Sequence, residues 1–327
     1  MGPLAGDVTA DGGRAVRRPH RIVSLLPSAT EIVCAVGASA ELVGISHECD
    51  FPAGIRDRPV VTRSRIAAGG SSRSIDGEVR AVLRDALSIY EVDEAELARL
   101  APDMIVTQDL CEVCAVSLDD VRAAVARLAG RDPAAPPPSI VSLQPTRLAH
   151  VLDDVERVGA ALGRSGEARA VRAELQRRID AISARAARAA HRPRVASIEW
   201  VEPLMLGGTW MPELIELAGG VPVGVAAGQP APTIEPAELG RLRPDVILVK
   251  PCGFTLGRAL DERDVIERAI MRPAGARARV AVTDGSAFFN RPGPRLVESL
   301  EIMAACLHPA LFGDLAARHA GVTTWLQ

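Results

Sequence analysis

A chain of 327 residues, 48% of them hydrophobic, has enough material for one large or two medium domains with a substantial core. The 38 basic and 41 acidic residues nearly balance and form no basic stripe, so no nucleic-acid partner is expected. The sequence has no apolar run of 18 residues, so we expect no membrane-embedded segment.

Residues 1–20 contain acids, glycines and arginines but no apolar core of the kind that a secretion signal carries. We therefore predict a disordered tail on a cytoplasmic protein whose cysteines are reduced. The alternative is that an export signal was trimmed from the sequence or lost through a misassigned start codon.

Residues 21–145 alternate between strand-like and helix-like patterns. Short β-rich runs lie at 21–26, 42–46, 103–108 and 139–143. Turn residues and then a helical pattern typically follow each run. This alternation predicts a parallel sheet covered by helices, and hence an N-terminal α/β lobe. Ser28 and Glu31 have the spacing of a capping box at the start of the first helix.

A long polar segment rich in alanine and arginine occupies residues 146–190. Its apolar residues recur at helical spacing. We predict a bridging helix here, either one helix with a kink near residues 163–166 or two helices in series.

Strand and helix patterns start again after this segment, at 194–200, 211–220, 245–250 and 279–284. Residues 191–327 are therefore predicted as a C-terminal α/β lobe. The motif E-L-x-R-L-x-P-D, followed by an apolar strand, begins once at Glu96 and again at Glu238. The two copies are too far apart for a solenoid and favour two similar lobes, although a common helix-to-strand turn could also arise twice by chance.

Two such lobes create a cleft, and ligands of parallel sheets collect at the carboxyl ends of the strands. The chain has only five Phe, three Trp and one Tyr, yet several of them fall at or near these ends. We predict that they line the cleft and stack on a flat ligand.

The segment DGSAFFNRPGP, residues 284–294, is predicted as a rigid ledge between a strand and the final helix. Adjacent side chains on an extended ledge point opposite ways. We expect Phe288 and Arg291 to face the cleft while Phe289 packs inward. The alternative is that both phenylalanines pack under the final helix.

Three parts of the sequence are distinctive: IVSLLPSATEIVCAVGASAELVGISHECDFP, the Pro-Asp-strand repeat and FNRPGPRLVESLEIMA. Together they resemble the helical-backbone (cluster A-type, class III) substrate-binding proteins of ABC importers, and the similarity runs from about Arg21 to about Phe312. Within the family, the chain most resembles the vitamin B12-binding branch. Glu48 and Gln108 stand where the B12 binder has aromatic residues.

The resemblance implies an α/β fold of two Rossmann-like lobes with parallel sheets, bridged by a long helix. It also implies a small-molecule ligand held between the lobes with little hinge motion: a cobalamin-like corrinoid, haem or a ferric siderophore. The implied partner is an ABC permease, docked through Glu96 and Glu238, one on each lobe. The alternative for both glutamates is ordinary charge on a helix surface. We expect a monomer.

The candidate ligand-binding residues are polar or aromatic side chains at or near strand ends, together with arginines able to pair with an anionic group. They are Ser28, His47, Glu48, Arg63, Arg65, Gln108, Glu199, Trp200, Trp210, Phe254, Phe288, Asn290 and Arg291. Arg63 and Arg65 fit ion-paired surface arginines equally well.

A second hypothesis is a cytoplasmic thiol-dependent metal-binding or redox protein on the same scaffold, holding zinc or iron. The candidate metal ligands are His47, Cys49, Cys111, Cys114 and Cys252. The alternative for the thiols is that they are small cleft or core residues. His47 could instead coordinate the metal of a corrinoid or haem, or be a hydrogen-bonded loop histidine. No GxSxG, P-loop, HExxH or GxGxxG motif occurs, so no enzyme is predicted.

Overall fold

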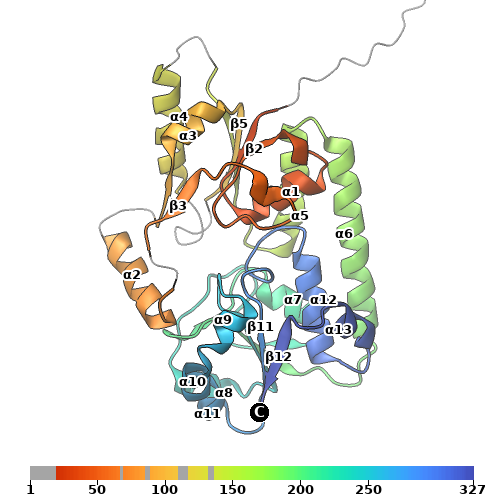
Figure 1. The fold of residues 1–327 in the computed structure, drawn as a ribbon. Helices are drawn as coiled ribbons and strands as arrows, with labels where there is room; N and C mark the ends of the chain where they lie inside the picture. Colours follow the sequence, from red (N-terminus) through yellow and green to blue (C-terminus); the bar gives the residue numbers. More distant parts are fainter. Residues whose placement is uncertain (1–19, 67–68, 85–88, 110–116, 132–135) are drawn as a thin grey trace, which may run out of the picture.

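The computed structural model describes residues 20–66, 69–84, 89–109, 117–131 and 136–327. Within these ranges the predicted α/β fold is confirmed: two mainly parallel sheets, each with its own helices, lie at opposite ends of the molecule (Figure 1). None of the helices in these ranges is long and apolar enough to cross a membrane. Residues 1–19 of the predicted tail lie outside the described part of the chain.

The first sheet has the strand order β2-β1-β5-β6, and all its pairs are parallel. Its strands are β1 (Ile22–Ser24), β2 (Leu42–Gly44), β5 (Met104–Gln108) and β6 (Ser139–Leu143). The helices of this region are α1 (Pro27–Ala35), η1 (Ser39–Glu41), η2 (Ile55–Asp57), α3 (Glu94–Leu100), α4 (Leu118–Arg131) and α5 (Leu148–Ala161). An excursion between β2 and α3 contains the antiparallel pair β3 (Thr62–Ser64) and β4 (Tyr90–Val92), with α2 (Ser72–Arg84) between them.

The second sheet has the order β12-β11-β10-β7-β8, and β9 also pairs with β7. Its strands are β7 (Arg194–Trp200), β8 (Met205–Leu206), β9 (Val221–Pro222), β10 (Val246–Val249), β11 (Arg279–Thr283) and β12 (Thr323–Leu326). Its helices are α7 (Met211–Leu217), α8 (Pro236–Leu242), α9 (Leu256–Leu260), α10 (Arg263–Ile266), the π-helix η3 (Glu267–Met271), α11 (Arg272–Ala274), α12 (Leu296–Leu307) and α13 (Gly313–Arg318).

The two copies of the sequence repeat have the same local structure. Helices α3 and α8 end in left-handed residues, Ala101 with φ 40° and Arg243 with φ 47°. The aspartate of each Pro-Asp pair, Asp103 or Asp245, then accepts a hydrogen bond from a backbone N–H at the start of the first strand of its sheet. The orders β2-β1-β5-β6 and β9-β7-β10-β11 also correspond. The repeat is therefore structural and not a chance similarity.

The predicted bridging helix over 146–190 is two helices that pack side by side, α5 and α6 (Ser165–Ala186). The chain reverses at Gly163, whose φ of 65° favours glycine. Gly159 lets the helices approach, because a Cβ there would lie 2.2 Å from Cβ of Ala168. Helix α6 extends along the second lobe, where it contacts α7 and α12, whereas α5 reaches that lobe at its first residue, Leu148, whose N–H donates to Glu213 of α7. The lobe boundaries near residues 145 and 191 stay a prediction.

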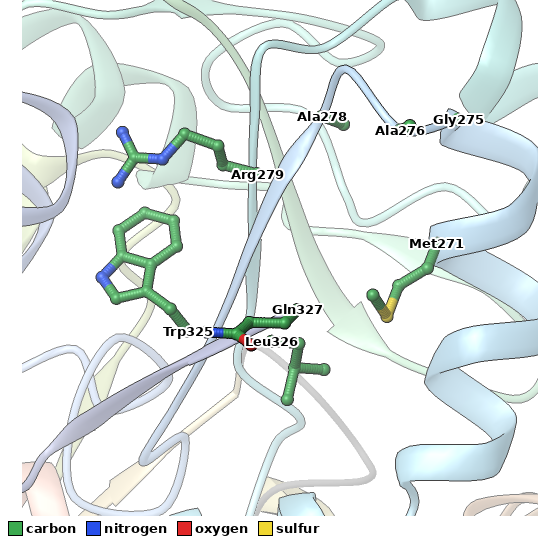
Figure 2. Close-up of a pocket in the computed structure, with 8 residues that line it drawn as sticks. All are labelled: Met271, Gly275, Ala276, Ala278, Arg279, Trp325, Leu326 and Gln327. Carbon is green, nitrogen blue, oxygen red and sulfur yellow. The ribbon is translucent and has the colours of Figure 1, made fainter.

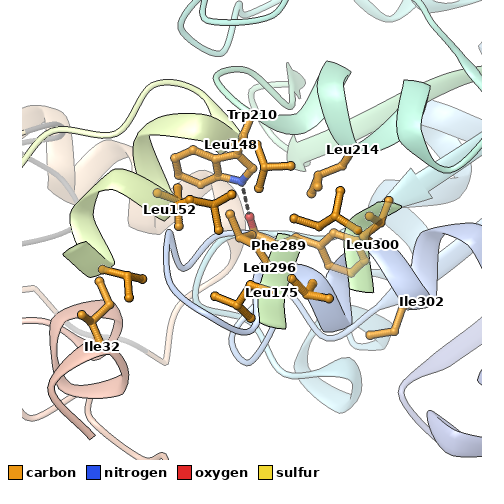
Figure 3. Close-up of a cluster of buried hydrophobic side chains, with 14 of the residues drawn as sticks. Ile32, Leu148, Leu152, Leu175, Trp210, Leu214, Phe289, Leu296, Leu300 and Ile302 are labelled. Atoms are coloured by element: carbon orange, nitrogen blue, oxygen red, sulfur yellow. Dashed lines mark hydrogen bonds between the residues drawn. The ribbon is translucent and has the colours of Figure 1, made fainter. Parts of the chain in front are cut away.

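One buried apolar cluster contains residues from both ends of the molecule (Figure 3). Ile32 of α1 and Leu152 of α5 belong to it, as do Leu175 of α6 and Leu300 of α12. The lobes thus share a hydrophobic core beside α5 and α6, and this shared core favours a stiff connection.

Candidate ligand-binding site

The loops at the carboxyl ends of the two sheets contact each other. Asp50, in the loop after β2, accepts hydrogen bonds of 2.5 and 3.1 Å from the guanidinium of Arg291, in the segment after β11. Glu31 of α1 accepts bonds of 2.7 and 3.1 Å from Arg295, which precedes α12. Because ligands of parallel sheets bind at this edge, the candidate site lies where these loops meet.

His47, in the loop after β2, has a solvent-accessible side chain, and a contact of one ring nitrogen with Thr62 holds the ring in place. Its Nδ1 lies 2.7 Å from Oγ1 of Thr62, and its ring packs edge-to-face on Tyr90 with centroids 5.0 Å apart. Partial burial lowers the pKa of His47 although the charge of Glu48 opposes the shift, so the imidazole is neutral at pH 7. Glu48 accepts a 2.8 Å hydrogen bond from the Tyr90 hydroxyl. The sequence reasoning missed Tyr90, although it is the only tyrosine of the chain.

Two further candidates, Ser28 and Gln108, are buried. Ser28 is 1% exposed at the start of α1, and its Oγ has no hydrogen-bond partner. The expected capping box is absent, because no side chain caps α1 and Glu31 pairs with Arg295 instead. Gln108 ends β5 and is 4% exposed.

The predicted thiol–metal cluster does not form among the described residues. Within those ranges no three His, Cys, Asp or Glu side chains come close enough to hold a metal ion. Cys49 is buried with its Sγ 3.0 Å from Oγ1 of Thr30, and burial raises its pKa to about 11, so the thiol stays protonated. Cys252 is a partly buried free thiol. Cys111 and Cys114 lie outside the described residues.

The phenylalanines of the ledge at 284–294 have different surroundings. Phe289 is fully buried, and its peptide is fixed by two hydrogen bonds, each of 2.8 Å: its N–H donates to Oγ of Ser299, and its carbonyl accepts from Trp210 (Figure 3). Its φ of 67° is strained for a bulky residue. Phe288 is partly buried, edge-on to His319, with the Arg295 guanidinium 5.5 Å from its ring centroid.

Arg295 connects the ledge to the first lobe. Its guanidinium lies 4.2 Å from the ring centroid of the exposed Phe51 as well as 5.5 Å from that of Phe288, and so contacts one phenylalanine from each lobe. Phe288 and Arg291 therefore lie on the side of the ledge that meets the other lobe, but Arg291 is already occupied by Asp50. Sequence reasoning missed Phe51 and Arg295, whose roles depend on contacts between segments far apart in the chain.

Lys250, the only lysine of the chain, is fully buried at the end of β10. Its Nζ donates 2.6 Å to Oδ1 of Asn290 and lies 3.3 Å from Oε2 of Glu199. Asn290 donates in return to the carbonyls of Lys250 and Gly285. Asn290 thus holds the ledge against the end of β10, and Glu199 of β7 shares the Lys250 ammonium with it.

The remaining candidates are engaged with protein groups. Trp210 is 6% exposed and Phe254 is 4% exposed, so both belong mainly to the core. Trp200 is partly buried and contacts Phe254 edge-on. Arg63 and Arg65 both pair with Glu91 on the small β3–β4 sheet.

A hollow of about 510 Å³ lies away from these residues (Figure 2). Met271, Arg279, Trp325 and Leu326 are among its lining residues. Arg279 starts β11, so this hollow is at the amino edge of the second sheet, where parallel sheets do not bind ligands.

The comparison with known proteins identifies the family. A family model described as "Periplasmic binding protein" matches residues 22–287. The chain belongs to this family. The resemblance to the substrate-binding proteins of ABC importers is thereby confirmed, and a family of solute-binding proteins agrees with the prediction that the chain is not an enzyme. No curated protein matches the sequence.

Solved structures share the fold at low identity. A periplasmic haem-binding protein of Pseudomonas aeruginosa is 18% identical, with a TM-score of 0.64 over 90% of this chain and 94% of its own. A periplasmic vitamin B12-binding protein of Vibrio cholerae is 18% identical, with a TM-score of 0.60 over 89% and 98%. A periplasmic haem-binding protein of Roseiflexus is 19% identical, with a TM-score of 0.63 over 90% and 100%.

The predicted cytoplasmic location is wrong. The family and the similar structures are periplasmic or extracytoplasmic solute-binding proteins. The prediction relied only on the lack of an apolar core in residues 1–20, and the family to which the chain belongs contradicts it.

Proposed function

We propose that this periplasmic binding protein holds a metal chelate between its lobes and presents it to an ABC permease. A cobalamin-like corrinoid is the leading ligand, and haem or a ferric siderophore is the alternative. The names of the similar structures, which bind vitamin B12 or haem, support this ligand class. The observation that carries the proposal is the position and state of His47.

His47 has the properties of an axial metal ligand. The contact of Nδ1 with Thr62 orients the ring and leaves Nε2 for a metal. The lowered pKa keeps the imidazole unprotonated at neutral pH, as coordination requires. Cobalt in a corrinoid or iron in haem would accept this nitrogen.

The surroundings of His47 suit the edge and face of a macrocycle. The Tyr90 ring packs on His47, and the exposed Phe51 of the same loop adds apolar surface beside Arg295. Each Å² of such surface removed from water contributes about 25 cal/mol. Glu48, held by the Tyr90 hydroxyl, can accept hydrogen bonds from amide groups on the ligand.

Glu96 and Glu238 suit the proposed permease contact. Each is near the start of a short helix, α3 or α8, in the equivalent position of the repeat. A helix that precedes a parallel strand starts near the carboxyl edge of the sheet, so both glutamates are expected on the side of their lobe where the ligand enters. In addition, Glu96 pairs with Arg99, and Glu238 completes the capping box of α8.

Spectral titration tests the ligand assignment. Hydroxocobalamin, cyanocobalamin and haemin are added separately to the protein and to His47→Ala, with His191→Ala as the control. His191 is an exposed histidine near the amino end of β7, away from the site. We expect hydroxocobalamin to bind with a shift of its visible bands, and His47→Ala to lose that shift and at least about tenfold in affinity.

Haemin binding with a histidine-type spectrum, and no corrinoid binding, would move the assignment to haem. Binding of any probe with the same spectrum and affinity in the parent and in His47→Ala would contradict the axial role. Failure of all three probes at micromolar concentration would refute the corrinoid and haem assignments.

A further inference from the structure

Helix α2 belongs to the first lobe by sequence but docks on the second. It lies between β3 and β4, the small sheet beside the first lobe. Its buried Ile75 and partly buried Val79 nevertheless pack in the apolar cluster of the second sheet, with residues such as Ile198. Figure 1 shows α2 on the left of the molecule and α6 on the right. The lobes are thus joined on two sides.

Polar contacts fix the first turn of α2 to the second lobe. The N–H and Oγ of Ser72 donate to the carboxylate of Glu262 at 3.0 and 2.9 Å. This carboxylate is 5% exposed and satisfies a helix N–H that has no partner within the helix. Arg258 donates to the carbonyl of Gly70 and lies 3.2 Å from Glu262, and Arg73 pairs with Glu202 at 2.5 Å.

The docked turn covers an aromatic pair. The indole N–H of Trp200 donates to the carbonyl of Ser72 at 3.2 Å. The Trp200 and Phe254 rings meet edge-to-face at 5.2 Å, and the guanidinium of Arg258 lies 4.3 Å from the Phe254 ring centroid. Trp200 is the last residue of β7, and Phe254 lies in the loop after β10. Both are therefore at the carboxyl edge of the sheet, where a solute would be expected to contact the second lobe.

The helix has little stability of its own. It has 13 residues and contains Gly77, and an isolated helix of this length is marginal in water. Most of its other residues are exposed or half-buried. Its position therefore depends on the docking contacts around Ser72 and Ile75. The much larger shared core beside α5 and α6 does not depend on them.

We propose that α2 is a clasp that releases from the second lobe as a local unit and so uncovers Trp200 and Phe254 to the entering solute. The shared core and α6 keep the lobes together while the clasp is open. The clasp itself rests on contacts within this chain. Its role in solute entry rests on the proposed function.

Hydrogen exchange of the ligand-free protein tests the clasp. The double variant Ser72→Ala, Arg73→Ala removes two side-chain contacts to the second lobe without touching the core of either lobe. We expect exchange of the α2 amides to become about tenfold faster, with the thermal midpoint of the whole protein unchanged. The control is Arg80→Ala, which removes the exposed pair with Asp76 inside α2 and should leave exchange within about twofold of the parent. Exchange of α2 only through global unfolding, or equal rates in the parent and double variant, would overturn the proposal.

Stopped-flow binding of hydroxocobalamin and haemin tests the role in entry. We expect the association rate constant of the double variant to exceed that of the parent by about the same factor as its α2 amides exchange faster. Arg80→Ala should associate at the rate of the parent. Faster exchange with unchanged association rates would show that the clasp opens but does not control entry, and would overturn that part. If neither probe binds the parent, the proposed function fails, whereas the exchange rates still decide whether α2 is a clasp.

Discussion

Asp154 on α5 is a buried carboxyl group whose charge is poorly compensated. Its side chain is 1% exposed, and neither oxygen has a hydrogen-bond partner. Arg157 lies 3.3 Å from Oδ1 without hydrogen-bond geometry. Burial raises the pKa of Asp154 to about 6, which the charge of Arg157 only partly opposes. The folded protein therefore holds this proton at pH values where the unfolded chain has lost it.

Because the pKa of Asp154 is raised in the folded state, the free energy of unfolding should fall as the pH rises from about 4 through about 6. Through Asp154 alone, the free energy of unfolding should be about 1 kcal/mol higher at pH 5 than at pH 8. In Asp154→Asn this contribution should vanish. Urea unfolding of both proteins at the two pH values measures the difference. Identical pH dependence in parent and variant would contradict the buried, uncompensated state.

At the level of single residues, the sequence located strand ends better than side-chain directions. Trp210 was expected in the cleft but donates to the Phe289 carbonyl inside the core. Position along the chain indicates the edge of a sheet, whereas direction depends on partners from distant segments. Lys250 was visible as the only lysine, but its partners Glu199 and Asn290 come from the ends of two other strands.

At the level of elements, the ledge between β11 and α12 offers two adjacent phenylalanines with different surroundings. Phe289→Ala removes a fully buried ring and should lower the free energy of unfolding by about 3–5 kcal/mol. Phe288→Ala should cost clearly less, because that ring is only partly buried. Chemical denaturation of the two variants compares them directly. Equal losses would mean that both rings pack as core.

The pattern of apolar residues predicted helix over 146–190 but could not show that the chain reverses. Helical spacing is the same in one long helix and in two packed helices. The reversal depends on the left-handed Gly163 and on the close approach of Gly159 to Ala168, a tertiary contact. The strand–helix alternation and the repeat, by contrast, are local patterns. They predicted the strands of the first sheet and the parallel strands β7, β10 and β11 of the second, but not β8, β9 or the antiparallel edge strand β12.

At the level of the whole molecule, three sets of contacts join the lobes: the ion pairs at the facing loops, the shared apolar core, and the docking of α2 on the second lobe. Partial burial opposes ionisation of Asp50, but the hydrogen bonds and charge of Arg291 outweigh it and lower its pKa. Burial raises the pKa of Glu31 in spite of its bond from Arg295. The Asp50–Arg291 pair is therefore the more firmly charged of the two.

A double-mutant cycle of Asp50→Ala and Arg291→Ala should give a coupling energy of about 1–3 kcal/mol in unfolding experiments, because the pair is partly buried and bidentate. The radius of gyration from small-angle scattering should stay that of the parent in all three variants, since α6 and the shared core hold the lobes without the pair. Arg177→Ala, which breaks an exposed pair with Glu174 on α6, is the control and should change neither quantity measurably. An expanded double variant would show that the ion pair, and not the core, sets the distance between the lobes.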